Sequence, residues 1–153
     1  QRVGPNTLLR ETIAMLKPQI PDRIRVDIRL GDVPMIQCYP QELNQVFMTL
    51  LVTAVDAIGE LGYITAVCSF AEEDIRITIG DTGRGMSPEE VEQIFDIGFA
   101  KRGATMRMNV SLAMCQNIIH KHRGRIAVQS QLGQGTTFEI ILPTSNERQD
   151  HMA

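Results

Sequence analysis

The order and spacing of apolar residues predict a two-layer α/β sandwich, in which helices cover one face of a mixed sheet. Segments with apolar residues every three or four positions, typical of helices, separate pairs of segments in which apolar and polar residues alternate. Such alternation is typical of strands with one buried face and one face in water. The 153 residues, 43% of them hydrophobic, are enough for one domain with a two-layer core.

The first half of the chain contains two predicted helices and two predicted strands. Asn6 is expected to cap a short amphipathic helix that ends near Pro18. Alternation predicts a half-buried strand over 23–30 and a short second strand over 34–38. The longest helix is predicted over 42–58, where apolar residues recur at helical spacing until two glycines follow.

The second half contains two further helices and two hairpins. Ser87 as a cap and Glu90 at the third helical position predict a short helix that runs to Phe95. Residues 96–107 have no period, and the helical pattern returns over 108–120. The remaining strands form two predicted hairpins, 63–70 with 74–79 and 125–130 with 136–142.

Composition argues against several classes of function. A net charge of −3 does not favour a nucleic-acid partner or contact with an anionic membrane, because phosphate binding requires a basic surface. The cysteines are odd in number and lack metal-ligand spacing, so reduced, buried thiols are expected at Cys38, Cys68 and Cys115. No apolar run reaches the length of a membrane span.

The chain boundaries give two further expectations. Because the chain begins at Gln1 without Met, we expect it to be a fragment of a longer protein. Residues 1–143 are expected to form the domain, and the polar residues 144–153 a disordered tail.

The turn after the strand at 74–79 is the strongest candidate for a ligand site. Asp81 ends the strand, where its carboxylate can accept a hydrogen bond from an exocyclic amine. Gly83 and Gly85 are expected to adopt positive φ and to let the backbone approach a flat ligand. The alternative is an ordinary turn, since Asp and Gly are common turn residues.

Four segments, in this order, resemble motifs of the ATP-binding catalytic domain of sensor histidine kinases, which belongs to the GHKL superfamily. The resemblance covers roughly residues 5–143. Four ordered matches are more specific than any one of them. The matching segments are 45–57 (the N box), 81–85 (the first glycine box), 94–99 (the F box) and 133–138 (the final turn and strand).

The resemblance implies a mixed five-stranded sheet packed against three helices. It also implies that ATP lies between the N-box helix and the lid after the first glycine box. Asp81 would bind the adenine amino group, while Gly83 and Gly85 would admit the base. Met86 and Thr137 would lie beside the base, although core and strand packing is an equal alternative for both.

The N-box helix departs from the family pattern at its metal ligand. By the resemblance, Thr53 and Asp56 belong to the nucleotide site. Histidine kinases carry asparagine at the positions of Thr49 and Thr53, and the second asparagine ligates Mg²⁺. A threonine hydroxyl is a poorer ligand than an amide oxygen, so a weakened Mg²⁺ site is expected at Thr53.

The phosphate end of the site departs further. The second glycine box aligns with 107–112, where the chain has no glycine. Backbone N–H groups at glycines bind phosphate, so this end of the site is altered. Lys101, Arg102 and Arg107 could supply positive charge to a phosphate, and solvated loop residues are the alternative.

The resemblance therefore implies transfer of the ATP γ-phosphoryl group to a histidine in a separate helical-hairpin dimerisation domain upstream. A response regulator would be an indirect partner, and the domain would be cytoplasmic, either free or as part of a membrane-bound sensor. His120 and His122 fit a helix end better than a phosphoacceptor, so no catalytic residue is expected in this chain. The alternative is a degenerate, pseudokinase-like docking module. A topoisomerase-type or repair-type ATPase fits less well.

Overall fold

The computed structural model describes residues 1–95 and 106–144, with the backbone alone over 106–111. In chain order the elements are β1 (Arg2–Val3), α1 (Pro5–Leu16), the short 3₁₀ helix η1 (Lys17–Gln19), β2 (Ile24–Leu30), β3 (Ile36–Gln37), α2 (Pro40–Ala57), β4 (Gly62–Ala71), β5 (Asp74–Asp81), α3 (Pro88–Gln93), α5 (Met106–Lys121), β6 (Arg125–Gln131) and β7 (Gly135–Pro143).

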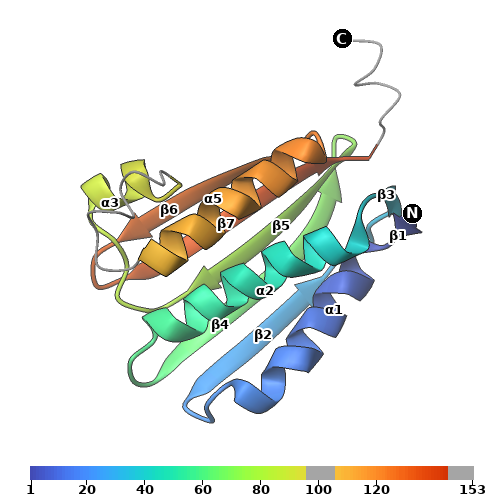
Figure 1. Cartoon of the computed structure of the whole chain (residues 1–153). Coiled ribbons are helices and arrows are strands. Elements are labelled where there is room, and N and C mark those ends of the chain that lie inside the picture. The colour runs from blue at the N-terminus through green and yellow to red at the C-terminus, as the bar shows by residue number, and fades with distance from the viewer. Residues whose placement is uncertain (96–105, 145–153) are drawn as a thin grey trace.

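Five strands form one mixed sheet in the order β2-β4-β5-β7-β6. The β2 and β4 strands are parallel, and every other neighbouring pair is antiparallel. The three long helices α1, α2 and α5 lie side by side over one face of this sheet (Figure 1). The predicted two-layer α/β sandwich, with a five-stranded sheet and three covering helices, is confirmed.

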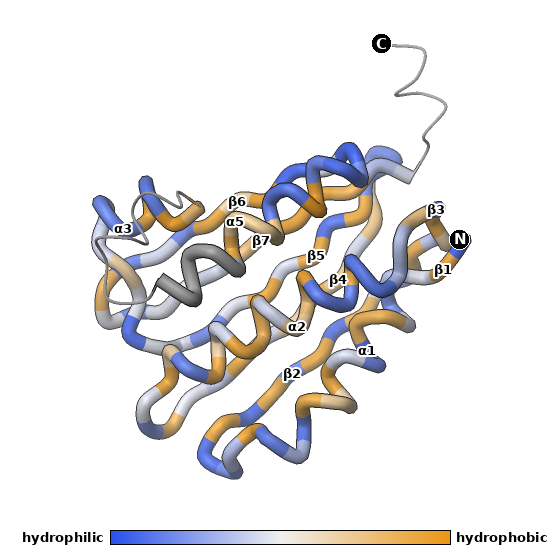
Figure 2. The backbone as a smooth tube through the Cα atoms, viewed as in Figure 1, coloured by the Kyte–Doolittle hydropathy of each residue, from blue (hydrophilic) through white to orange (hydrophobic). Residues whose placement is uncertain are grey.

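The core lies between these helices and the inward face of the sheet. The isoleucines of β5 at positions 75, 77 and 79 are almost completely buried, and they face the stripe formed by Phe47 and Leu50 on α2. Hydrophobic and hydrophilic residues alternate along the strands, as Figure 2 shows. The outward face carries exposed ion pairs such as Arg76 with Glu139, at 3.4 Å between Nη1 and Oε2.

The prediction that Asn6 caps the first helix is wrong. The first helix begins at Pro5 with Gly4 as its cap, because proline is preorganised for the first helical position. Asn6 lies inside the helix, and its side-chain amide donates to the carbonyl of Gly31 at 2.7 Å. The short strand β3 pairs with β1 in a separate two-stranded ribbon and does not join the main sheet.

Other boundaries agree with the predictions to within about two residues. The α3 helix has the predicted capping box, since Ser87 and Glu90 exchange side-chain to backbone hydrogen bonds of 3.0 and 3.2 Å. The α5 helix begins at Met106, two residues before the predicted start. No helix in the described part of the chain combines the length and apolar composition that a membrane crossing requires. The predicted tail, beyond Thr144, lies outside the described residues.

Candidate functional site

A cavity of about 400 Å³ opens where the C-terminal half of α2 meets the ends of β5 and β7. Both α3 and the first described side chain of α5 complete its wall. The cavity therefore lies at the junction of five elements, each of which contributes at least one side chain. Its lining residues are Thr53, Asp56, Ala57, Asp81, Arg84, Gly85, Met86, Glu90, Ile94, Leu112, Thr136 and Phe138.

Asp81 lies at the end of β5, and its carboxylate is held by backbone donors. The N–H of Gly83 donates to Oδ1 at 2.8 Å, and the N–H of Thr136 on the neighbouring strand also donates to the carboxylate. Burial raises the pKa of Asp81, while these two hydrogen bonds and the nearby Arg84 guanidinium oppose that rise. An ionised carboxylate is only an acceptor, so Asp81 can bind a ligand amine.

The two glycines of this turn are required for different reasons. Gly85 has φ +70°, and a Cβ there would collide with the carbonyl oxygen of Gln131 at the end of β6. Gly83 does not have positive φ, so this part of the prediction is wrong. A Cβ on Gly83 would instead lie 2.5 Å from the carbonyl oxygen of Ala57 at the end of α2. The glycine at 83 therefore permits close packing of the turn against the helix.

The glycine turn is also tied to the β6–β7 hairpin by hydrogen bonds. The N–H of Met86 donates to Ser130 Oγ at 2.8 Å, and the N–H of Gly133 donates to the carbonyl of Arg84 at 2.7 Å. Contacts on both sides, to α2 and to the hairpin, fix the position of Asp81 before any ligand binds. No pattern in the sequence points to Ser130, because its partner Met86 lies 44 residues away along the chain.

On β7 the cavity is lined by Thr136, and Thr137 does not line it. Side chains alternate between the two faces of a strand, and β7 turns Thr136, Phe138 and Ile140 toward the helices. Thr137 pairs with Gly80, and its hydroxyl lies on the outward face of the sheet. The predicted threonine is therefore displaced by one residue from the one that reaches the cavity.

The wall from α2 contains both residues predicted on this helix, Thr53 and Asp56. The Thr53 hydroxyl donates to the carbonyl of Thr49, one helical turn earlier, at 2.7 Å. Its hydrogen is thereby used, while its lone pairs stay available to a cation. Within residues 1–95 and 106–144, no group of three His, Cys, Asp or Glu side chains could hold a metal ion. Thr53 therefore fits only a Mg²⁺ ion whose other ligands are mostly water and phosphate oxygens.

The phosphate end of the predicted site is described only in part. Lys101 and Arg102 lie outside the described residues, and Arg107 is described only as backbone within α5. Two charged residues outside the predicted site, Arg84 and Glu90, also line the cavity. Arg84 follows Gly83 directly, so its position in the motif was the available signal.

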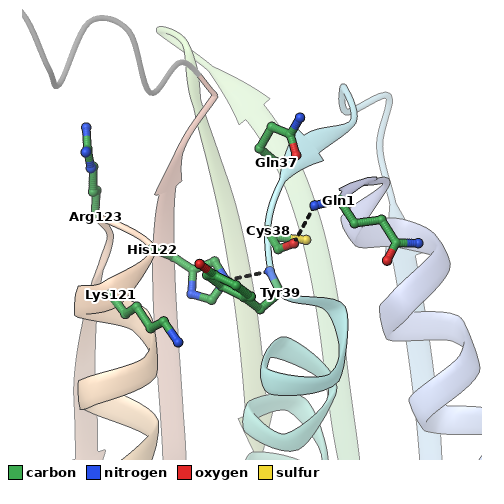
Figure 3. A pocket seen from close by; sticks show the side chains of 7 residues that line it. All are labelled: Gln1, Gln37, Cys38, Tyr39, Lys121, His122 and Arg123. Carbon is green, nitrogen blue, oxygen red and sulfur yellow. Dashed lines mark hydrogen bonds between the residues drawn. The ribbon is translucent and has the colours of Figure 1, made fainter.

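A second cavity, of about 290 Å³, lies at the opposite end of α2 (Figure 3). His122 Nε2 accepts the N–H of Tyr39 at 3.1 Å, and Nδ1 lies 2.8 Å from the carbonyl of Ile118. These two contacts place the imidazole hydrogen on Nδ1. His122 therefore connects the C-terminal end of α5 to the N-terminal end of α2, a structural role that fits a residue at a helix end. Lys121 Nζ lies 2.9 Å from Oε2 of Glu42, and the N-terminal amine of Gln1 donates to the carbonyl of Cys38 at 3.2 Å, so several of the groups that line this cavity already have partners. Its lining residues are Gln1, Gln37, Cys38, Tyr39, Lys121, His122 and Arg123.

Comparison with known sequences identifies the family. The family described as histidine kinase-, DNA gyrase B-, and HSP90-like ATPase matches residues 38–146. The sensor histidine kinase ZraS of Escherichia coli K12 is 32% identical over 152 residues, which are 98% of this chain and 32% of that protein. The adaptive-response sensory kinase SasA of Synechococcus elongatus is 34% identical over 116 residues, 74% of this chain and 30% of that protein. The chain thus spans about a third of the length of these relatives.

Solved structures show the same fold at lower identity. The catalytic domain of the histidine kinase ThkA superposes with a TM-score of 0.82 at 21% identity, over 97% of both chains. Full-length ShkA in complex with AMPPNP gives a TM-score of 0.81 at 23% identity, over 95% of this chain and 31% of that one. The chain therefore belongs to the histidine kinase-, DNA gyrase B-, and HSP90-like ATPase family, and its fold is that of a histidine kinase catalytic domain.

Proposed function

We propose that this chain binds Mg²⁺-ATP in the 400 Å³ cavity and serves as the catalytic domain of a two-component sensor histidine kinase. The observation that carries the proposal is Asp81, a carboxylate held by two backbone donors at the floor of the cavity. It faces a wall of α2 that offers the lone pairs of Thr53. One end of the cavity is thus suited to a base with an exocyclic amine, and another to a hydrated cation.

Phosphoryl transfer in such a domain depends on positioning and on neutralisation of charge, with little covalent work by the protein. Asp81 would orient the nucleotide through its base, and the packed glycine turn would keep that carboxylate in place. Thr53 would contribute one ligand to Mg²⁺, which supplies positive charge to the phosphates when bound. Lys101, Arg102 and Arg107 would add positive charge from the segment that follows α3.

The partners and the location follow from the same proposal. The γ-phosphoryl group would pass to a histidine in a helical-hairpin dimerisation domain upstream, and from there to a response regulator. Relatives named as sensor kinases support this, as does the ThkA structure in complex with the response regulator TrrA, which has a TM-score of 0.81. The domain would act in the cytoplasm, either alone or as part of a membrane-bound sensor.

Calorimetric titration with ADP and a non-hydrolysable ATP analogue, each with and without Mg²⁺, tests the proposal. We expect micromolar binding by the unmodified chain. Asp81→Asn replaces the charged carboxylate acceptor by a neutral amide, so nucleotide binding should weaken by about tenfold or more. Asp74→Asn is the matched control, because Asp74 begins the same strand, β5, at the end away from the cavity. Equal losses in both variants would show that Asp81 has no special role.

A second pair of variants tests the metal ligand. Thr53→Val keeps the volume but removes the hydroxyl, so the gain in affinity of the ATP analogue on adding Mg²⁺ should shrink. Thr78→Val, on the outward face of β5, should leave that gain unchanged. If neither ADP nor the analogue gives detectable heat with a chain that unfolds cooperatively, the proposal fails and the docking-module alternative is favoured.

A further inference from the structure

The Ser130 hydroxyl on β6 connects the glycine turn to the floor of the nucleotide cavity. It accepts the N–H of Met86 at 2.8 Å, lies 3.0 Å from the carbonyl oxygen of Gly135, and lies 2.7 Å from Oγ1 of Thr136. Thr136 is 6% exposed, lines the cavity, and pairs in register with Asp81 on β5. Ser130 itself does not line the cavity.

The three contacts of Ser130 can all be satisfied in only one way. A hydroxyl has one hydrogen and two lone pairs, while a carbonyl oxygen can only accept. Ser130 must therefore give its hydrogen to Gly135, since the two oxygens would otherwise face each other without a hydrogen between them. The Met86 N–H then takes one lone pair of Ser130, and the Thr136 hydroxyl donates to the other. Thr136 is left with lone pairs alone for any ligand.

The floor of the cavity thus has two hydrogen-bond acceptors side by side. Asp81 accepts through its carboxylate. The Thr136 hydroxyl can only accept, because it donates its single hydrogen to Ser130. The exocyclic group of a 6-amino purine is an amine whose two hydrogens can each be donated to an acceptor, whereas the exocyclic group of a 6-oxo purine is an oxygen that only accepts. Two acceptors face a 6-oxo group unfavourably, because no hydrogen lies between them.

We propose that Ser130 is a positioning residue that sets base selectivity by holding the Thr136 hydroxyl as an acceptor, so that the site prefers 6-amino over 6-oxo purine nucleotides. The inference rests on the proposed function, since it requires a nucleotide in this cavity. When Ser130 is absent, the Thr136 hydroxyl can rotate and donate to a 6-oxo group. The preference then falls, whatever happens to overall affinity.

The test is calorimetric titration of the unmodified chain, Ser130→Ala and Ser69→Ala with ADP and with inosine diphosphate, at the same Mg²⁺ concentration. Ser69 is an exposed serine on β4, so its variant is the matched serine-to-alanine control. In Ser130→Ala the Thr136 hydroxyl is no longer held in one orientation. Since one neutral hydrogen bond is involved, the ratio of ADP affinity to inosine diphosphate affinity should fall by about three- to tenfold. The ratio in Ser69→Ala should stay at the unmodified value.

The outcomes separate this inference from the proposed function. Equal weakening of both nucleotides in Ser130→Ala would mean that Ser130 only supports the turn, and it would overturn the inference while ADP binding still stands. Absence of binding by the unmodified chain would overturn the proposed function, and the inference with it. Thermal unfolding checks that each variant folds. If Ser130→Ala does not fold, Ser130→Cys, which has similar volume and a weak donor, is measured in the same way and should shift the ratio in the same direction.

Discussion

Replacing Gly85 by alanine should destabilise the fold and distort the candidate site together. Gly85 has φ +70°, and a left-handed conformation costs a non-glycine residue about 1–2 kcal/mol. The new Cβ would also collide with the carbonyl oxygen of Gln131, and overpacking of this kind costs about 1–3 kcal/mol. The sum is a loss of about 2–5 kcal/mol in the free energy of unfolding, a large share of the ~5–15 kcal/mol typical of a domain.

Gly133→Ala is a control that isolates the collision. Gly133 has a similar φ of +79°, but a Cβ there would meet nothing within 4 Å. Only the backbone penalty of about 1–2 kcal/mol is expected in this variant. Urea unfolding followed by circular dichroism gives both values, and ADP titration at a temperature where both variants are folded gives the effect on the site. If the two variants lose the same stability, the collision with Gln131 is not a determinant of the turn.

Three further predictions concern the core and its buried groups. Ile77→Ala should lower the free energy of unfolding by about 2–5 kcal/mol, because Ile77 is fully buried. Ile28→Ala should lower it by clearly less, because the Ile28 side chain is 40% exposed. Similar losses for the two variants in urea unfolding would refute the assigned core. Burial raises the pKa of Asp81, so the folded state holds its proton more tightly and stability falls as the pH rises through that window. Asp81→Asn should therefore be more stable than the unmodified chain at pH 7, and this advantage should shrink below about pH 4. An advantage that grows on acidification would contradict this sign. Burial raises the pKa of Cys68 and Cys115 to about 11, so iodoacetamide at pH 8 should modify them slowly in the folded chain and quickly in urea, as measured by mass spectrometry.

The site could be predicted from sequence wherever it depends on a compact local motif. Asp81 and Gly85 lie within five residues of each other, and both line the cavity. Thr53 and Asp56 also line the cavity, because they lie on one helix at a spacing that places them on one face. Their binding to nucleotide and Mg²⁺ remains a prediction.

The site could not be predicted where it depends on register between distant strands. The alternation of β7 is visible in the sequence, but its pairing with β5 places Thr136, and not Thr137, beside Asp81. Ser130 gave no signal, because a serine in an alternating strand is ordinary until the hairpin brings it to Met86. The reason for Gly83 was also misjudged, since the close approach of Ala57 exists only after α2 packs against the turn.

The sequence by itself determined the class of fold, the order of the elements and the turn at the candidate site. These depend on hydrophobic periodicity, capping residues and glycines, all of which act within a few residues along the chain. Tertiary structure alone decided that Thr136 faces the cavity and that its hydroxyl donates to Ser130. It also decided that β3 pairs with β1 outside the main sheet. Each of these depends on the register in which strands pair or on how elements pack against one another, which is fixed only when the helices and strands come together.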